Sequence, residues 1–294
     1  MGKAERNRRQ SARERIAAQQ AAARRADRRR QLLLAGGSVV AVLAIVVAFV
    51  VIKTLGGPAS AGSGQATASA SLAREVTSVP AATLTSVGKG TAGPKTIIPI
   101  SGTPLTENGK PEVLYMGALY CPFCATERWA MTIALSRFGT FSGLKFIHSS
   151  ASDTPASIPT LTFYKSTYTS KYISFTPDEM QDVNRATLQA PTAAQSAILT
   201  KYDAPPQVPQ GSSGSIPFID FGNKFIVSGA SYSYAVLQGK TWAQVAAALK
   251  DPSTAIAKGA DGAANMITAA ICKLTSNKPA TACTPAVQSI EGTF

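Results

Sequence analysis

Residues 113–138 read VLYMGALYCPFCATERWAMTIALSRF, an apolar run followed by two cysteines and a longer run with regularly spaced apolar residues. The apolar run predicts a buried strand that ends at Gly117, and the spacing after the cysteines predicts a helix that ends near Gly139. Cys121 and Cys124 then occupy the first turn of this helix, close enough to form a disulfide. The unpaired N–H groups and positive dipole of a helix N-terminus favour a thiolate over a thiol. The stretch therefore predicts a cysteine pair suited to thiol–disulfide exchange.

We expect Cys121 to be the nucleophile, because the first cysteine of such a motif is the exposed one at the helix N-terminus. Cys124 is then the buried resolving thiol, and Pro122 suits the first helical turn, where its missing N–H is not needed. The alternative is an inert structural disulfide, which is common outside the cytoplasm. The chain holds one His and no second closely spaced Cys pair, whereas a zinc site needs about four such ligands. Neither a metal nor a bound cofactor is therefore expected.

Residues 1–31 form a basic arm, with eleven Lys or Arg residues against three acidic ones. The next 21 residues, 32–52, carry no charge, and at about 1.5 Å each they span about 30 Å, the thickness of a hydrocarbon core. We therefore predict one transmembrane helix over 32–52, with its N-terminus in the cytoplasm and the later residues outside it. The alternative is a cleaved signal peptide, because residues 59–61 fit a cleavage pattern. The apolar segment is longer than the roughly 7–15 residues of a signal peptide, which favours a retained anchor.

The formal net charge of +13 is concentrated in the basic arm. An arm placed next to a membrane is expected to contact anionic headgroups or to enforce the topology. Nucleic-acid binding is the less favoured alternative, and nucleic acid is not among the expected partners.

The composition changes again after the predicted anchor. Residues 53–74 are mostly Gly, Ala, Ser and Thr, with too little apolar surface to fold, which predicts a linker. Residues 75–294 are long enough to form one extracytoplasmic domain with a C-terminal extension. Residues 72–111 fit either a linker or the first elements of that domain.

Several short segments follow the cysteine-bearing helix. Residues 144–148, 161–164 and 172–175 read as strands, 178–202 as mostly helical and 241–249 as a helix. Two apolar runs within 216–227 flank Gly222-Asn223, which predicts a hairpin with a two-residue turn. The order of strand, cysteine-bearing helix, strand, helical excursion, hairpin and final helix is similar to that of thioredoxin-like proteins. The predicted class is α/β, a thioredoxin-like fold with a helical insertion, preceded by one transmembrane helix.

Pro217 opens the first strand of this hairpin. The resemblance to thioredoxin-like proteins implies a cis Ile216–Pro217 bond beside the cysteine pair, with the backbone of Ile216 presented to an incoming polypeptide. Ile216 and Pro217 are thus the expected substrate-binding residues. The alternative is an ordinary proline at the first residue of an edge strand.

The same resemblance shows two departures. Strongly oxidising relatives carry His at the position of Phe123, where it stabilises the thiolate, so its absence predicts a less oxidising pair. Thioredoxins place a buried, proton-relaying acid six residues before the first cysteine, and here that residue is Tyr115. Glu127 is the nearest carboxylate and a candidate proton acceptor. The alternative is that Glu127 pairs with Arg128 or faces solvent near the helix start.

Cys272 and Cys283 are the remaining pair, with Pro279 between them. Their short spacing favours a structural disulfide that ties down the C-terminal segment, worth typically about 2–3 kcal/mol for a loop of this size. The alternative is a second redox pair that passes electrons to Cys121.

Three stretches carry a closer resemblance. They are YMGALYCPFCATERWAMTIALSRFGTFSGL (115–144), YISFTP (172–177) and IPF (216–218). On these stretches the chain is identified as a member of domain-of-unknown-function family 929 (DUF929). The resemblance implies a membrane-anchored, thioredoxin-like protein and assigns it no substrate.

The sequence therefore predicts a membrane-anchored, extracytoplasmic thiol–disulfide oxidoreductase that acts on secreted or envelope proteins through Cys121 and Cys124. Its expected partners are cysteine-containing client polypeptides, a redox partner that recycles the cysteine pair, and the membrane. The alternative is a non-enzymatic envelope scaffold or interaction module whose cysteine pair is structural. Oxidase, reductase and isomerase directions all stay open at this point.

Overall fold

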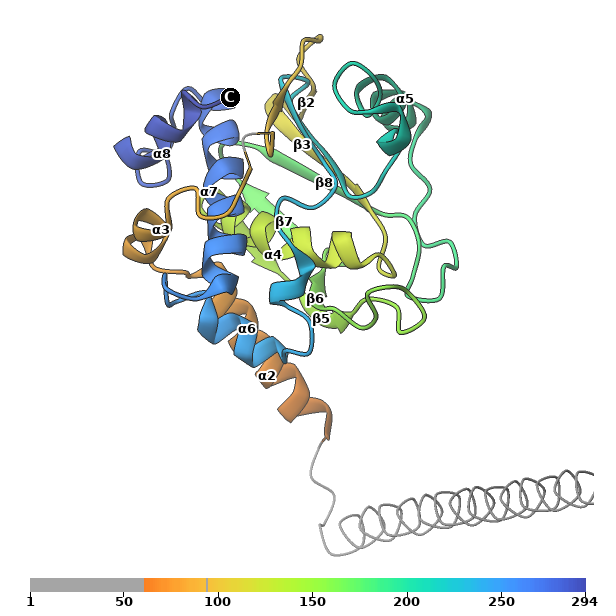
Figure 1. Ribbon diagram of the computed structural model, residues 1–294, viewed down its shortest axis with the longest axis vertical. Coiled ribbons are helices and arrows are strands. Elements are labelled where there is room, and N and C mark those ends of the chain that lie inside the picture. The colour runs from red at the N-terminus through yellow and green to blue at the C-terminus, as the bar shows by residue number, and fades with distance from the viewer. Residues whose placement is uncertain (1–60, 94) are drawn as a thin grey trace, which may run out of the picture. The chain divides into compact units, whose positions relative to one another are not determined.

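The strand predicted before the cysteines is β3 (Lys110–Gly117), the central strand of a mixed sheet (Figure 1). The computed structural model describes residues 61–93 and 95–294. The predicted basic arm and the predicted transmembrane helix over 32–52 lie outside these residues. Within 61–93 and 95–294, no helix combines the length and the apolar character that a membrane crossing requires.

Six strands form the central sheet in the order β1-β10-β9-β3-β2, and β8 also pairs with β3. Besides β3, these strands are β1 (Ile98–Pro99), β2 (Thr106–Glu107), β8 (Ser174–Glu179), β9 (Phe218–Phe221) and β10 (Phe225–Ser228). β8 runs parallel to β3, whereas β9 runs antiparallel to both β3 and β10. A strand that is paired on both edges and covered on both faces reads as a continuous apolar run, as β3 does.

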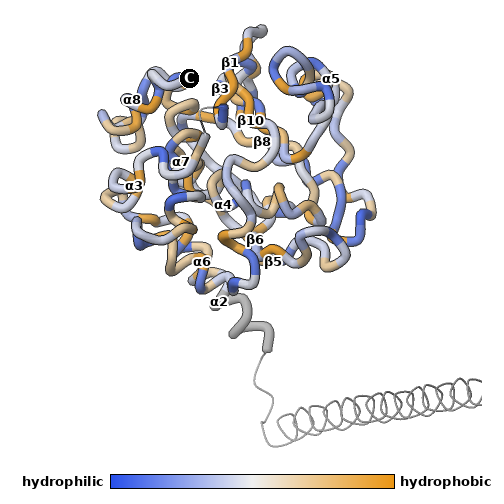
Figure 2. Tube along the Cα trace, in the orientation of Figure 1, coloured by the Kyte–Doolittle hydropathy of each residue, from blue (hydrophilic) through white to orange (hydrophobic). Residues whose placement is uncertain are grey.

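Helices cover both faces of this sheet. α4 (Pro122–Ser136) and α7 (Ala255–Leu274) cover one face, and α5 (Ala193–Tyr202) covers the other (Figure 1). Alternate residues of β3 point to opposite faces, so Val113 packs in the core under α4 and α7 while Leu114 packs toward α5. Hydrophobic residues accordingly follow β3 and β10 between the helices (Figure 2).

The remaining helices surround this core. They are α2 (Ala61–Thr77), α3 (Ala81–Val87), α6 (Trp242–Ala248) and α8 (Pro285–Glu291). Part of the predicted linker over 53–74 therefore belongs to α2. Alanine-rich sequence also has high helix propensity, and Val76, which is 1 % exposed, joins the end of α2 to the core.

The predicted hairpin is confirmed as β9 and β10. Phe221 lies opposite Phe225, so three residues, 222–224, connect the strands where the sequence predicts two. Gly222 and Asn223 have φ angles of 62° and 54°, positive values of the kind that a tight hairpin turn needs. The N–H of Asn223 donates to the Asp220 carboxylate at 2.6 Å, which closes the turn. The turn residues thus set the register of the hairpin.

Two small sheets separate α4 from β8 in the sequence. β4 (Gly139–Ser142) pairs with β7 (Thr167–Ser170), and β5 (Lys145–His148) pairs with β6 (Pro159–Thr162). The strand predicted at 144–148 therefore exists, but it pairs with β6. The strand that joins β3 in the central sheet after the cysteine-bearing helix is β8.

The helix predicted over 178–202 is wrong for its first half. Asp178 and Glu179 end β8, and α5 begins only after Thr192, which caps it in a capping box. Pro177 followed by two acidic residues has the local pattern of a helix start. Pairing of β8 with β3 over six residues overrides that local preference.

α7 is absent from the sequence-based prediction, although it packs beside α4 along the core. Its two glycines, Gly259 and Gly262, are unfavourable in a helix interior. A Cβ atom at Gly259 would lie 2.6 Å from Cδ2 of Tyr232, and one at Gly262 would overlap the carbonyl oxygen of Lys89. Both glycines therefore allow neighbouring segments to approach α7 closely.

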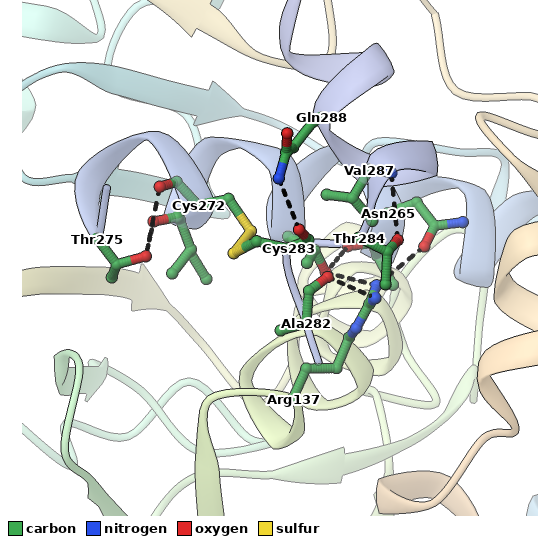
Figure 3. The surroundings of a disulfide bond; sticks show 12 residues. Arg137, Asn265, Cys272, Thr275, Ala282, Cys283, Thr284, Val287 and Gln288 are labelled. Carbon is green, nitrogen blue, oxygen red and sulfur yellow. Dashed lines mark hydrogen bonds between the residues drawn. A yellow bond between two sulfur atoms is a disulfide. The ribbon is translucent and has the colours of Figure 1, made fainter. Parts of the chain in front are cut away.

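Cys272, in α7, and Cys283 form a disulfide with an S–S distance of 2.00 Å, the pairing that their spacing favours (Figure 3). Arg137, at the C-terminal end of α4, donates to the carbonyl oxygen of Ala282 at 2.8 Å and to Oδ1 of Asn265 at 3.1 Å. The disulfide loop is thus joined to the cysteine-bearing helix as well as to α7.

A buried carboxyl lies in α7. Asp261 is 0 % exposed, and neither of its carboxylate oxygens has a hydrogen-bond partner in the described part of the chain. Burial raises the pKa of Asp261 to about 8. A carboxyl with a raised folded-state pKa stabilises the fold at low pH, and this contribution is lost as the pH rises through the folded-state value.

We expect Asp261→Asn to raise the free energy of unfolding at pH 9 by about 1 kcal/mol or more, because a neutral amide avoids the buried charge. At pH 5, where Asp261 is protonated, the variant and the wild type should differ much less. Urea unfolding at both pH values measures this. Asp251→Asn, at an exposed site before α7, is the matched control and should not gain stability at pH 9. An equal effect of D261N at both pH values would contradict the assignment.

Candidate active site

The cysteine pair lies at the start of α4, after the short loop that follows β3. Cys121 is the N-cap of α4, and its Sγ accepts a hydrogen bond from the backbone N–H of Cys124 at 3.3 Å. The connecting loop is held by backbone bonds from Leu119 to Gln181 at 2.8 Å and from Cys121 to Ala118 at 3.3 Å. The structure thus places both sulfurs on the first turn, as the sequence predicts.

Both cysteines are free thiols, and both are buried. Cys124 is 0 % exposed, and Cys121 is 4 % exposed, so the exposure expected of Cys121 is not observed. The side chains of Tyr120 and Ile216 pack against the two cysteines and Ala118 and account for this burial. A reaction partner must therefore displace or pass these side chains to reach Cys121.

The structure brings Ile216 and Pro217 to the cysteine pair, as expected. The Sγ of Cys121 donates to the carbonyl oxygen of Ile216 at 3.7 Å, and the Ile216–Pro217 peptide bond is cis. The carbonyl oxygen of Pro217 accepts from the N–H of Gly229 at 2.8 Å, which ties this turn to the end of β10. Residues far apart in sequence thus meet at one sulfur atom.

The two thiols have opposite pKa shifts. The hydrogen bond with the Cys124 side chain, together with backbone N–H groups of the first turn and the charge of Arg128, outweighs burial and lowers the pKa of Cys121 to about 7. Burial is the main reason that the pKa of Cys124 is raised well above its ordinary value, followed by its hydrogen bond to Cys121. Negative charge therefore resides on Cys121, the predicted nucleophile, and Cys124 holds the proton.

A buried ion pair lies next to the cysteines and is not found by the sequence analysis. Arg128 and Glu179 are both 0 % exposed. Nε of Arg128 donates to Oε1 of Glu179 at 2.8 Å, and Nη2 donates to Oε2 at 2.6 Å and to the carbonyl oxygen of Ala118 at 2.7 Å. Arg128 is one helical turn after Cys124, a spacing that places both on one side of α4. Glu179 is 51 residues away from Arg128, and no local pattern indicates the pairing.

Tyr115 is buried beside this ion pair. Its hydroxyl has no hydrogen-bond partner in the described part of the chain, and burial raises its pKa well above the ordinary value. A Cβ atom at Gly117 would lie 2.6 Å from Cζ of Tyr115, so Gly117 leaves the space that the ring fills. Tyr115 is therefore neutral.

Glu127 is buried and turned toward another segment. Its carboxylate accepts from the N–H of Ser231 at 2.7 Å and from the Ser231 hydroxyl at 2.8 Å. The alternatives of a pair with Arg128 or an exposed site are thus wrong, because Arg128 pairs with Glu179 and Glu127 is 0 % exposed. Burial raises the pKa of Glu127 to about 7. The group can therefore bind a proton near neutrality, but its oxygens are engaged by Ser231.

The approach to the cysteines has an apolar side and a charged side. Phe123, between the cysteines, is 43 % exposed and packs edge-to-face against Tyr234, with ring centroids 5.7 Å apart. On the other side, the guanidinium of Arg185 lies 3.7 Å from the centroid of the Tyr120 ring and pairs with Asp153 at 2.9 Å.

The described residues contain no group of three or more His, Cys, Asp or Glu side chains arranged to hold a metal ion. His148 lies with its ring 4.6 Å from that of Trp242. This packing accounts for His148 without a catalytic role.

Comparison with known proteins identifies the family. Residues 96–273 match the model described as Domain of unknown function (DUF929). The match covers more than half of the chain, which therefore belongs to DUF929. No curated protein and no solved structure matches the chain.

We expect alkylation of the reduced wild-type protein by iodoacetamide to follow the ionisation of Cys121, with a midpoint at about pH 7. Cys124→Ala removes the hydrogen bond that contributes most to this shift, so the midpoint should move upward. Mass spectrometry of quenched samples identifies the alkylated residue. A midpoint near that of an ordinary thiol in the wild type, or alkylation first at Cys124, would contradict the assignment of the nucleophile.

Proposed function

We propose that this protein is a thiol–disulfide oxidoreductase of thioredoxin-like fold that acts on cysteine-containing secreted or envelope proteins. The observation that carries the proposal is the asymmetric pair at the start of α4. Cys121 has a pKa lowered to about 7, and the fully buried Cys124 has a raised one. A nucleophilic thiolate with a protonated resolving thiol three residues away is what two-step exchange requires.

The sheet supports the thioredoxin-like assignment. β3 leads into the cysteine-bearing helix, β8 returns parallel to β3, and the β9–β10 hairpin follows on the other edge of β3. The cis Ile216–Pro217 bond immediately precedes β9 and meets Cys121. This is the strand order and the proline position that thioredoxin-like proteins share.

In the exchange reaction, the Cys121 thiolate attacks one sulfur of a client disulfide. The client S–S bond breaks, its electron pair leaves on the second client sulfur, and Cys121 becomes joined to the client. Cys124 then loses its proton and attacks Sγ of Cys121, which releases the client as a thiol and leaves a Cys121–Cys124 disulfide. The client gains two electrons and two protons, and the same steps in reverse oxidise a client dithiol.

Ile216 and Pro217 give the client a place to bind. The carbonyl of Ile216 accepts from Cys121 at 3.7 Å, and Ile216 lies two residues before the start of β9. A client segment that pairs with this backbone brings its own sulfur to Cys121. Phe123, the exposed aromatic side chain next to Cys121, adds an apolar contact without a sequence requirement.

The location of the reaction is proposed from the sequence. The uncharged residues 32–52 after a basic arm support a retained anchor, which would leave the cysteine-bearing domain outside the cytoplasm. There the pair needs a membrane or envelope redox partner that returns it to its starting state after each client.

A peptide with one cysteine in a mixed disulfide to a coloured aromatic thiol tests this function in the full-length protein. We expect reduced wild type to release both the aromatic thiol and the peptide. Cys124→Ser should release the aromatic thiol but retain the peptide on Cys121 as an adduct visible by mass spectrometry.

Cys121→Ser is the matched control, and it should form no adduct at the buried Cys124. An absence of adduct in folded C124S would support the scaffold alternative and contradict the proposal.

A further inference from the structure

We propose that Arg128, fixed by Glu179 and by the carbonyl of Ala118, holds negative charge on Cys121 and thereby shifts the pair toward donating its disulfide to clients. This inference rests on the proposed exchange function and assigns it a direction. It also gives a positioning role to a residue that the motif does not include.

The first step is the fixed geometry of the guanidinium. Nε and Nη2 of Arg128 face the Glu179 carboxylate at 2.8 Å and 2.6 Å, and Nη2 also donates to the Ala118 carbonyl at 2.7 Å. Two parallel N–H···O bonds fix a planar guanidinium in orientation as well as in position. Glu179 is itself held, because Oε1 accepts from the N–H of Phe163 at 3.3 Å.

The second step concerns the nitrogen of the guanidinium that takes no part in these contacts. Nη1 of Arg128 is buried and has no hydrogen-bond partner in the described part of the chain. Since Nε and Nη2 form the edge that faces Glu179, Nη1 lies on the opposite edge of the plane. The Glu179 carboxylate therefore neutralises one edge of the cation, and uncommitted donors remain on the other.

The third step is the position of this group next to the sulfurs. Ala118, whose carbonyl binds Nη2 of Arg128, also accepts from the N–H of Cys121 and packs in one cluster with Cys121 and Cys124. The charge of Arg128 lowers the pKa of both thiols, although burial and the hydrogen bond to Cys121 outweigh it at Cys124. Burial keeps the neighbouring hydroxyl of Tyr115 neutral by raising its pKa. The thiolate at Cys121 is thus an anion that the charge of Arg128 can stabilise.

The direction of exchange follows from which state carries the anion. A client thiolate attacks Cys121 in the Cys121–Cys124 disulfide, and the electron pair of the broken S–S bond goes to Cys124. A second client thiolate then attacks the client sulfur joined to Cys121 and leaves a client disulfide and the Cys121 thiolate.

The client has lost two electrons and two protons, of which Cys124 takes one proton and solvent takes the other. Stabilising the Cys121 thiolate stabilises the reduced pair, so it favours transfer of the disulfide to the client.

This assignment also revises the expectation drawn from Phe123. The absence of His at that position predicts a pair less oxidising than the strongly oxidising relatives, because the charge that stabilises the thiolate is missing there. Arg128 supplies a positive charge from the buried side, and an arginine remains charged over the pH range in which Cys121 titrates.

Two variants of the full-length protein with opposite expected signs test the inference. Arg128→Met combined with Glu179→Gln removes both charges and avoids leaving one unpaired in the core. We expect it to raise the Cys121 midpoint by about one pH unit, a tenfold change in the thiolate equilibrium. Glu179→Gln alone leaves the full charge of Arg128, so the midpoint should fall. The absorbance of the thiolate at 240 nm against pH measures both.

The redox readout is the equilibrium of each variant with glutathione. The double variant should shift toward the Cys121–Cys124 disulfide, because its reduced form is less stable. A rise of the Cys121 pKa from about 7 to about 8 makes this shift about tenfold at pH 9, where Cys121 is ionised, and less than about twofold at pH 7, where only about half of the wild-type thiol is ionised. Arg137→Met is the matched control. It removes another largely buried arginine of α4, far along the helix at the Cys272–Cys283 loop, and should lower stability without moving the midpoint.

If the midpoint of the Cys121 titration is unchanged in both folded variants, Arg128 and Glu179 have only a structural role and the inference is overturned. If the double variant does not fold, Glu179→Gln alone decides, because it leaves the charge of Arg128 without its partner; a midpoint that does not fall in this variant would again overturn the inference. A wild type that does not exchange with glutathione would instead contradict the proposed function, while the midpoints would still report on Arg128.

Discussion

The buried ion pair between Arg128 and Glu179 is the interaction on which the rest of the structure depends. It joins the first turns of the cysteine-bearing helix to the end of β8 and, through Nη2, to the Ala118 carbonyl in the loop that leads to Cys121. Two charges with no solvent contact are stable only while their partners are in place. The pair therefore requires β8 to lie parallel to β3 and requires α4 to begin where it does, and both conditions define the position of the sulfurs.

The site is built from segments that converge on one sulfur atom. Cys121 is the N-cap of α4 and follows β3. The carbonyl of Ile216 comes from the segment just before β9, and the carboxylate that orients Arg128 comes from the end of β8. The hydrogen bond with the Cys124 side chain, the helix N-terminus and the guanidinium all favour an anion at Cys121, whereas burial favours a neutral Cys124. The asymmetry of the two thiols is thus a property of the whole sheet and not of the four-residue motif.

Local patterns predict the parts of this fold that local interactions determine. The strand before the cysteines, the helix after them and the Gly222-Asn223 hairpin all follow from periodicity and turn chemistry, and the structure has each of them. Tertiary pairing determines the parts that were missed. The sequence predicts a strand over 172–175, which includes the start of β8, but Pro177-Asp178-Glu179 has the local pattern of a helix start, so the continued pairing with β3 and the position of Glu179 are not predicted. The burial of Cys121 depends in the same way on Ile216, which lies 95 residues further along the chain.

The most direct test of the account is a redox titration of the full-length protein in glutathione buffers, with the free thiols at Cys121 and Cys124 followed by alkylation and mass spectrometry. The account predicts a reversible two-electron couple above about −230 mV, as a disulfide donor requires. A pair that stays oxidised below about −300 mV would behave as a structural disulfide and would contradict the account.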